Sequence, residues 1–132
     1  MRDYESLPDS MPPHEIAALF SELLDTRPQS VTAMLDALHE LADRQWHAYQ
    51  PLDAAIHKRV DAWLIANWDA ASLPFAQAVT TIVGRLGLPE SWVKIKSGNH
   101  MDDAVATEYS EFIAEMEQHG DPLDPWSGMP KP

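Results

Sequence analysis

The stretch from Ala70 to Gly84, AASLPFAQAVTTIVG, is the longest run in this sequence without a charged side chain. A helix that is apolar on nearly every side must be covered by other helices. We therefore expect residues 73–86 to form the central helix of a small bundle, with Ser72 as its N-cap. Gly84 lies inside this helix and should cost ~1 kcal/mol relative to alanine. This cost indicates either a close crossing with a neighbouring helix or an early helix end.

Proline and glycine mark the ends of the other apolar-periodic segments. Prolines open five of them, at Pro13, Pro28, Pro51, Pro74 and Pro89, and glycines follow three, at Gly87, Gly98 and Gly120. No segment shows the alternation or hairpin signals of strands. The expected helices span roughly 13–25, 29–49 (opened by Thr26 or Ser30), 52–68, 73–86, 89–97 and 101–119. The sequence thus predicts an all-α, compact single-domain bundle of five to six helices.

The domain boundaries follow from the same punctuation. We expect an N-terminal tail over 1–12, a helical domain over 13–119 and a proline-rich C-terminal tail over 120–132, because recurring prolines exclude a regular helix there. The core of the bundle should contain four residues of the central helix, namely Val79, Ile82, Val83 and Leu86. No sequence period supports a solenoid of helical repeats.

The charge of the chain is concentrated at its two ends. The net charge is −12, and residues 27–98 contribute nothing to it because they hold equal numbers of acids and bases. Residues 1–26 hold six acids and one base, and residues 99–132 hold eight acids and one base. An acidic field disfavours nucleic acid and anionic membranes and favours a basic protein partner. The alternative is that the acidity only keeps the protein soluble.

Composition excludes several kinds of chemistry. The chain has no cysteine, so disulfides, thiolate metal ligands and a cysteine nucleophile are not available. It has no GxSxG motif and no glycine-rich phosphate loop. The N-terminal residues lack the apolar run of a signal peptide, and the charge-free central stretch is too short to span a bilayer. We therefore expect a soluble, cytoplasmic protein without a cofactor.

A row of histidine and aspartate is the best candidate for a metal site. His39, Asp43 and His47 follow one another at steps of four on the second helix, and Asp53, His57 and Asp61 do so on the third. If the two helices paired antiparallel, the rows could meet, and imidazole with carboxylate suits zinc. The alternative, which we favour, is a solvated helix face without a metal, since this face lies opposite the apolar stripe. HELAD at 39–43 is not the HExxH motif of zinc proteases.

A second acidic row lies along the last helix. Glu108, Glu111 and Glu115 share one side of it, and a pyrophosphatase-like enzyme would use paired acidic motifs of this kind to hold magnesium. No matching acidic pair exists elsewhere in the chain, so a solvated or partner-facing surface is the better interpretation. Glu115 and Glu117 also oppose the helix dipole, which indicates a role outside the helix. The predicted partner-binding residues are Glu108, Glu111, Glu115, Glu117, Asp121 and Trp126.

The five tryptophans fall into two groups. Trp46 and Trp63 lie on apolar stripes and are predicted to be structural. Trp68 and Trp92 lie near helix ends, where they would cap the bundle or serve as interface anchors. Trp126, in the C-terminal tail, either packs back onto the bundle or is offered to a partner.

Two hypotheses about function follow from these features. The first is a non-catalytic acidic module that binds a basic protein such as a toxin or nuclease. In size and charge the chain is similar to bacterial immunity proteins, antitoxins and nuclease inhibitors, which is an analogy of class only. The second is a metal-dependent enzyme or metal-binding protein that uses His39, Asp43, His47 and His57.

Overall fold

Six α-helices and one short 3₁₀ turn make up the described part of the chain, which comprises residues 4–8, 10–26, 30–48, 50–97 and 102–118 of a computed structural model. The elements in chain order are η1 (Tyr4–Ser6), α1 (Pro13–Thr26), α2 (Val31–His47), α3 (Ala54–Ala66), α4 (Leu73–Leu86), α5 (Pro89–Lys96) and α6 (Asp103–Gln118). Within these residues there is no strand, and the prediction of an all-α bundle is confirmed.

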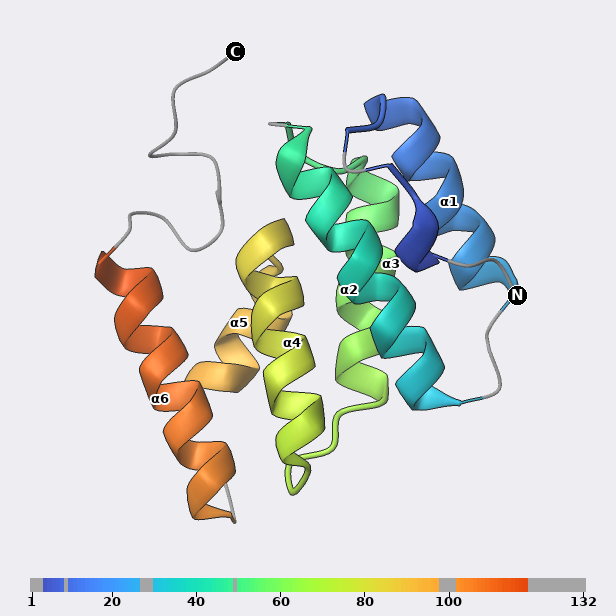
Figure 1. Cartoon of the computed structure of the whole chain (residues 1–132). Coiled ribbons are helices and arrows are strands. Elements are labelled where there is room, and N and C mark those ends of the chain that lie inside the picture. The colour runs from blue at the N-terminus through green and yellow to red at the C-terminus, as the bar shows by residue number, and fades with distance from the viewer. Residues whose placement is uncertain (1–3, 9, 27–29, 49, 98–101, 119–132) are drawn as a thin grey trace.

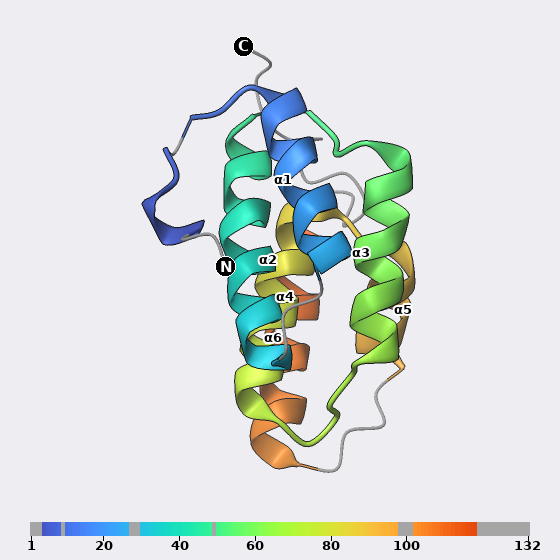
Figure 2. The same ribbon diagram turned by 90° about the vertical axis from the view of Figure 1, so that its right-hand side faces the viewer.

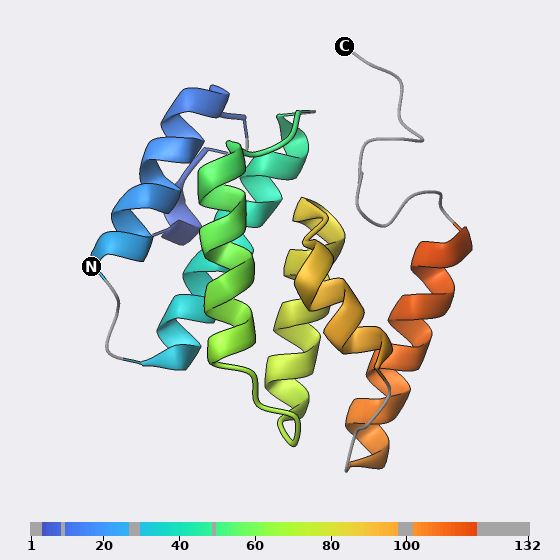
Figure 3. The ribbon, with the colours of Figure 1, turned by 180° about the vertical axis from the view of Figure 1, so that it is seen from behind.

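The helices form two layers. Helices α2, α4 and α6 lie side by side in one layer and run in the same direction, while α3 and α5 lie behind them and run the opposite way (Figures 1 and 3). Helix α1 closes one end of the molecule and packs on both α2 and α3 (Figure 2). Stacked helix pairs of this kind resemble the arrangement in α-solenoids, although the sequence has no repeat period.

Helix α4 lies at the centre of its layer, between α2 and α6 (Figure 1). Val79, Ile82 and Val83 are fully buried and Leu86 is almost so, which confirms the predicted core. The helix begins and ends where the sequence predicts. The Ser72 hydroxyl accepts a hydrogen bond from the Phe75 N–H at 3.1 Å, and Gly87 ends the helix in the left-handed conformation, at φ 68°.

The other helix ends also follow local sequence signals. Ser30, one of the two predicted caps of the second helix, accepts a hydrogen bond from the Ala33 N–H at 2.9 Å. Asp53 caps the start of α3 by accepting from two backbone N–H groups. Gly98, Gly120 and the predicted C-terminal tail lie outside the described residues.

The segment before Pro13, which the sequence assigns to a tail, contributes to the core. Tyr4 of η1 is buried, and the Leu7 carbonyl accepts a hydrogen bond from Arg44 Nη2 of α2 at 3.0 Å. Arg44 is itself only 5% exposed and pairs with Glu40 one turn earlier. No pattern in the sequence indicates that a charged residue of α2 is buried and bonds to this segment.

Candidate functional site

A groove of about 400 Å³ lies between α4 and α6 and is the candidate site of this molecule. We call it the α4–α6 groove. One residue of α2, four residues of α4 and five residues of α6 line it: Trp46, Thr80, Thr81, Gly84, Arg85, Glu108, Glu111, Phe112, Glu115 and Met116. Its walls differ in chemistry, because the α4 side is made of small side chains and one arginine, whereas the α6 side carries three carboxylates and two large apolar groups.

Gly84 allows the two helices of the groove to approach closely. A Cβ atom at this position would lie 3.2 Å from Phe112 Cε1 and 3.9 Å from Met116 Sδ. Of the two predicted explanations for Gly84, the close crossing is therefore confirmed, and α4 continues two residues beyond it to Leu86. The neighbouring Thr80 and Thr81 hydroxyls both donate to the Gln77 carbonyl of their own helix. Their oxygen atoms keep the capacity to accept a hydrogen bond.

Three carboxylates of α6 line the groove. Glu108, Glu111 and Glu115 occupy positions i, i+3 and i+7, so they follow one side of the helix over two turns. In the described ranges, no base forms an ion pair with any of the three and no donor bonds to their oxygens. The groove therefore presents negative charge that the fold itself does not neutralise.

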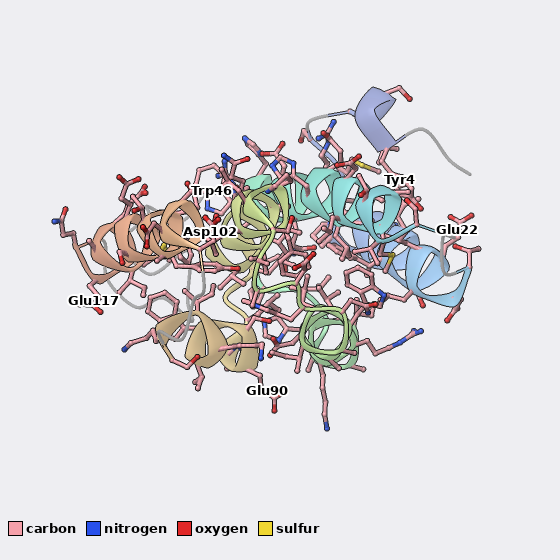
Figure 4. The ribbon with its side chains drawn as sticks, turned by 90° about the horizontal axis from the view of Figure 1, so that it is seen from below. Tyr4, Glu22, Trp46, Glu90, Asp102 and Glu117 are labelled. Atoms are coloured by element: carbon pink, nitrogen blue, oxygen red, sulfur yellow. The ribbon has the colours of Figure 1, made fainter. Side chains whose placement is uncertain are left out.

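The predicted partner-binding residues are thus only partly brought together. Glu117 is exposed on the side of α6 that faces away from α4, whereas Trp46 lies between α6 and α4 (Figure 4). Asp121 and Trp126 lie outside the described residues. Glu108, Glu111 and Glu115 remain as one continuous row on the groove.

Trp46 and Arg85 form the part of the site that sequence reasoning missed. Trp46 lies on an apolar stripe and was predicted to be structural, yet it is only partly buried and lines the groove. The Arg85 guanidinium lies over its indole ring, with Cζ 4.3 Å from the ring centroid, and His47 packs edge-on against the same ring. A signal was present in the sequence, since Arg85 is the only charge near the end of an otherwise apolar helix.

The three other tryptophans among the described residues, Trp63, Trp68 and Trp92, pack against the core. Trp92 is 7% exposed and packs edge-to-face against Phe112, and Trp68 lies between Phe75 and Tyr109. Trp63 is partly buried against the core, as its stripe predicts. Burial raises the pKa of the Tyr109 phenol well above its ordinary value, with smaller contributions from Asp69 and Glu108. The burial of Trp92 and the partial burial of Trp68 agree with the prediction that these residues cap the bundle, and their role at an interface stays untested.

The row at α3 is only partly a solvated face, because Asp53 is exposed whereas Asp61 is buried, which corrects the prediction for Asp61. Asp61 is 4% exposed and accepts hydrogen bonds from the Glu90 N–H, the Ser91 N–H and the Ser91 hydroxyl at 2.5–2.9 Å. It caps α5, whose own N-cap residue, Leu88, has no side chain able to do so. His57 Nε2 lies 3.1 and 3.0 Å from the carbonyl oxygens of Leu86 and Gly87, so this nitrogen carries the proton and donates it.

The two histidine and aspartate rows do not meet. His57 is engaged at the C-terminal end of α4, while His47 Nδ1 lies 2.8 Å from the carbonyl oxygen of Asp43 on its own helix. In the part of the chain that the structure describes, no three histidine, aspartate or glutamate side chains come together in a way that could hold a metal ion. The arrangement that the metal hypothesis requires of His39, Asp43, His47 and His57 is therefore not formed.

Two further findings bear on identity. None of the described helices combines the length and the apolar character that crossing a membrane requires. Comparisons with protein-family models, with curated proteins and with solved structures find no match to this chain.

Proposed function

We propose that this chain is a non-catalytic binding module and that its α4–α6 groove receives a basic segment of a partner protein. The observation that supports the proposal is the row of Glu108, Glu111 and Glu115, which has no internal partner among the described residues and lines a groove together with the apolar side chains of Phe112 and Met116. If these carboxylates served only solubility, there would be no reason for them to line a groove.

The chemistry of the groove suits lysine and arginine side chains. Their aliphatic stems pack on apolar surface while the charged ends reach polar groups, and Phe112 and Met116 supply such a surface. Carboxylates form strong charge-assisted hydrogen bonds with guanidinium groups. The described residues of the groove include three acids and a single base, Arg85, so this part of the lining is negative overall. Charge in a concave site acts mainly on the rate and specificity of association.

The class of partner follows from the whole chain. The net charge of −12 and the small size fit an inhibitor, an immunity-type protein or an antitoxin that engages a basic toxin or nuclease. In such a protein the acidic surface would bind the basic groups that the partner uses to bind its own target, and would thereby block that target.

Site-specific photocrosslinking in the producing cell tests this proposal. A photoreactive residue at Gln77 would stand exposed on α4, one turn before Thr81 on the same side, without removing a carboxylate or filling the groove. The matched control is Ala62, exposed on α3 in the opposite layer. We expect a single adduct with a protein of basic surface from Gln77 and none from Ala62. An adduct that forms equally from both positions, or with an acidic protein, would contradict the proposal.

A further inference from the structure

Arg85 is the only base among the described residues that line the α4–α6 groove, and its charged end is weakly held. The guanidinium stacks on Trp46 at 4.3 Å, and its nearest carboxylate oxygen among the described residues, Asp43 Oδ1, is 3.9 Å from Nη2. That separation is beyond hydrogen-bonding range. The side chain is also about one third exposed. The ring contact is therefore the main interaction that positions the guanidinium.

We infer that Arg85 occupies, in the free protein, the position on Trp46 that an arginine of the partner segment takes in the complex. This inference rests on the proposed function and specifies it, because it states that the groove selects arginine. Arg85 then competes with the partner's arginine for the indole ring of Trp46. Binding then requires that Arg85 leave the face of Trp46 and that the incoming guanidinium replace it.

General chemistry favours arginine over lysine as the occupant of the Trp46 ring, because a planar guanidinium can stack on an aromatic face. Arg85 shows that a guanidinium fits over this ring, with Cζ 4.3 Å from the ring centroid. The lysine contacts of the molecule involve other rings, with the Nζ atoms of Lys94 over Trp68 and of Lys96 over Trp92 at 5.6 and 5.5 Å from the centroids. An arginine in the groove could stack on Trp46 while its donors reach carboxylates of α6. A lysine ammonium is a compact, strongly hydrated charge and gains less from the ring.

The Arg85 guanidinium has an alternative partner, Asp43, when it leaves the Trp46 ring. Asp43 lies on the neighbouring turn of α2, is partly exposed, and already accepts a hydrogen bond from Arg44 Nη1 at 3.5 Å. A small rotation of the arginine side chain toward Asp43 would exchange the ring contact for a closer ion pair. The exchange leaves the cost of displacement small, so Arg85 tunes affinity and does not block the groove.

A fluorescently labelled, capped glycine peptide with arginine at every third position provides the probe, with fluorescence anisotropy at low salt as the readout. We expect Arg85→Ala to bind this peptide more tightly than the wild-type protein. Since any lost base makes the protein more acidic, the matched control is Arg59→Ala. Arg59 is exposed on α3 and pairs with Asp25. The substitution Arg59→Ala therefore removes the same charge far from the groove. Arg85→Ala should exceed this control by about twofold to fivefold in affinity.

The Trp46→Leu background separates competition from simple charge. Arg85 also repels a basic peptide simply because it lies in the groove, so some advantage of Arg85→Ala over Arg59→Ala should remain without the indole ring. This advantage should be clearly smaller in the Trp46→Leu background than with the ring present. The same peptide with lysine in place of arginine should bind more weakly and should show only the smaller advantage in both backgrounds. An advantage for the arginine peptide that Trp46→Leu leaves unchanged, equal affinities of the two alanine variants, or weaker binding by Arg85→Ala, would overturn the inference.

The failure of this inference is distinguishable from failure of the proposed function. The triple variant Glu108→Gln, Glu111→Gln and Glu115→Gln, with Arg85 in place, should bind the peptide more weakly than the wild-type protein does, whatever the role of Arg85. If that variant binds as the wild type does, the groove is not the basic site and both proposals are overturned. If it binds more weakly while Arg85→Ala matches Arg59→Ala, only the competition by Arg85 is overturned.

Discussion

Two sets of carboxylates on this molecule have similar helical spacing and opposite surroundings. On α3, Asp53 and Asp61 each accept hydrogen bonds from the backbone at the start of a helix, α3 itself and α5. On α6, Glu108, Glu111 and Glu115 have no such partner among the described residues and face a groove. The first set of carboxylates stabilises the fold, and we propose that the second set binds a partner protein.

The comparison teaches how to separate structural from functional acids. A carboxylate that stabilises the fold is buried or caps the start of a helix, and its removal leaves hydrogen-bond donors without an acceptor. A carboxylate kept for a partner adds little to the stability of the free protein, and its removal is felt only in binding. The predictions below test this division, from the largest expected effect on stability to the smallest.

Val79→Asp should have the largest effect on stability, because it places an unpaired carboxylate on the buried face of α4. Burying a charge without a partner usually unfolds a small domain, and we expect a loss of more than about 4 kcal/mol in urea denaturation. On the same helix, Gln77→Asp adds the same group at an exposed position and should cost at most about 0.5 kcal/mol. A Val79→Asp variant that melts within a few degrees of the parent would mean that α4 is not central.

Asp61→Ala should come next, with a loss of about 3 kcal/mol, since three donors at the start of α5 lose their acceptor in a buried place. Asp53→Ala removes an exposed cap of the same kind and should cost about 1 kcal/mol. Urea denaturation compares the two variants directly. Equal losses would show that the burial of Asp61 adds nothing to its capping role.

The triple change of Glu108, Glu111 and Glu115 to glutamine should leave stability within about 0.5 kcal/mol of the parent or raise it slightly. Like charges at steps of three and four repel each other, and Glu115 opposes the helix dipole. The matched control changes Asp36→Asn, Glu90→Gln and Glu117→Gln, three exposed acids outside the groove. A loss of several kcal/mol for the groove triple alone would assign those carboxylates to the fold.

Zinc should have no strong effect on the protein. His57 is engaged by the end of α4 and does not join His39, Asp43 and His47, so we expect no binding tighter than about micromolar in calorimetric titration. A one-to-one nanomolar isotherm that His39→Ala abolishes would revive the metal hypothesis.

The fold could be predicted largely from the sequence because its signals are local. Ser72, Gly87 and the apolar run over α4 define that helix by capping and periodicity alone, and the structure has the same bounds. The two-layer order of the helices was not predictable, since it depends on which faces pack together over long distances. Gly84 gave a correct hint of one such contact, although not of its partner Phe112.

The candidate site could be predicted only in part. The row of Glu108, Glu111 and Glu115 is visible from helical spacing. The groove that they line is not, because it depends on the crossing of α4 with α6. Trp46 follows an apolar stripe and looks like a core residue until α2 is seen to lie beside α4. Asp61 was misassigned for the same reason, because a polar residue on a helix face reads as solvated until the helix that covers it is known.

The most direct test of the central claim is the association rate of the crosslinked partner, measured by stopped flow as a function of salt. The groove variant carries Glu108→Lys, Glu111→Lys and Glu115→Lys. The control variant carries Asp36→Lys, Glu90→Lys and Glu117→Lys, so that both variants have the same net charge. We expect the groove variant to associate at least about tenfold more slowly at low salt and to lose most of its salt dependence, while the control stays close to the parent. Circular dichroism should show equal helicity in both. If the two variants slow association equally, the acidic surface acts only through its total charge and the α4–α6 groove is not the binding site.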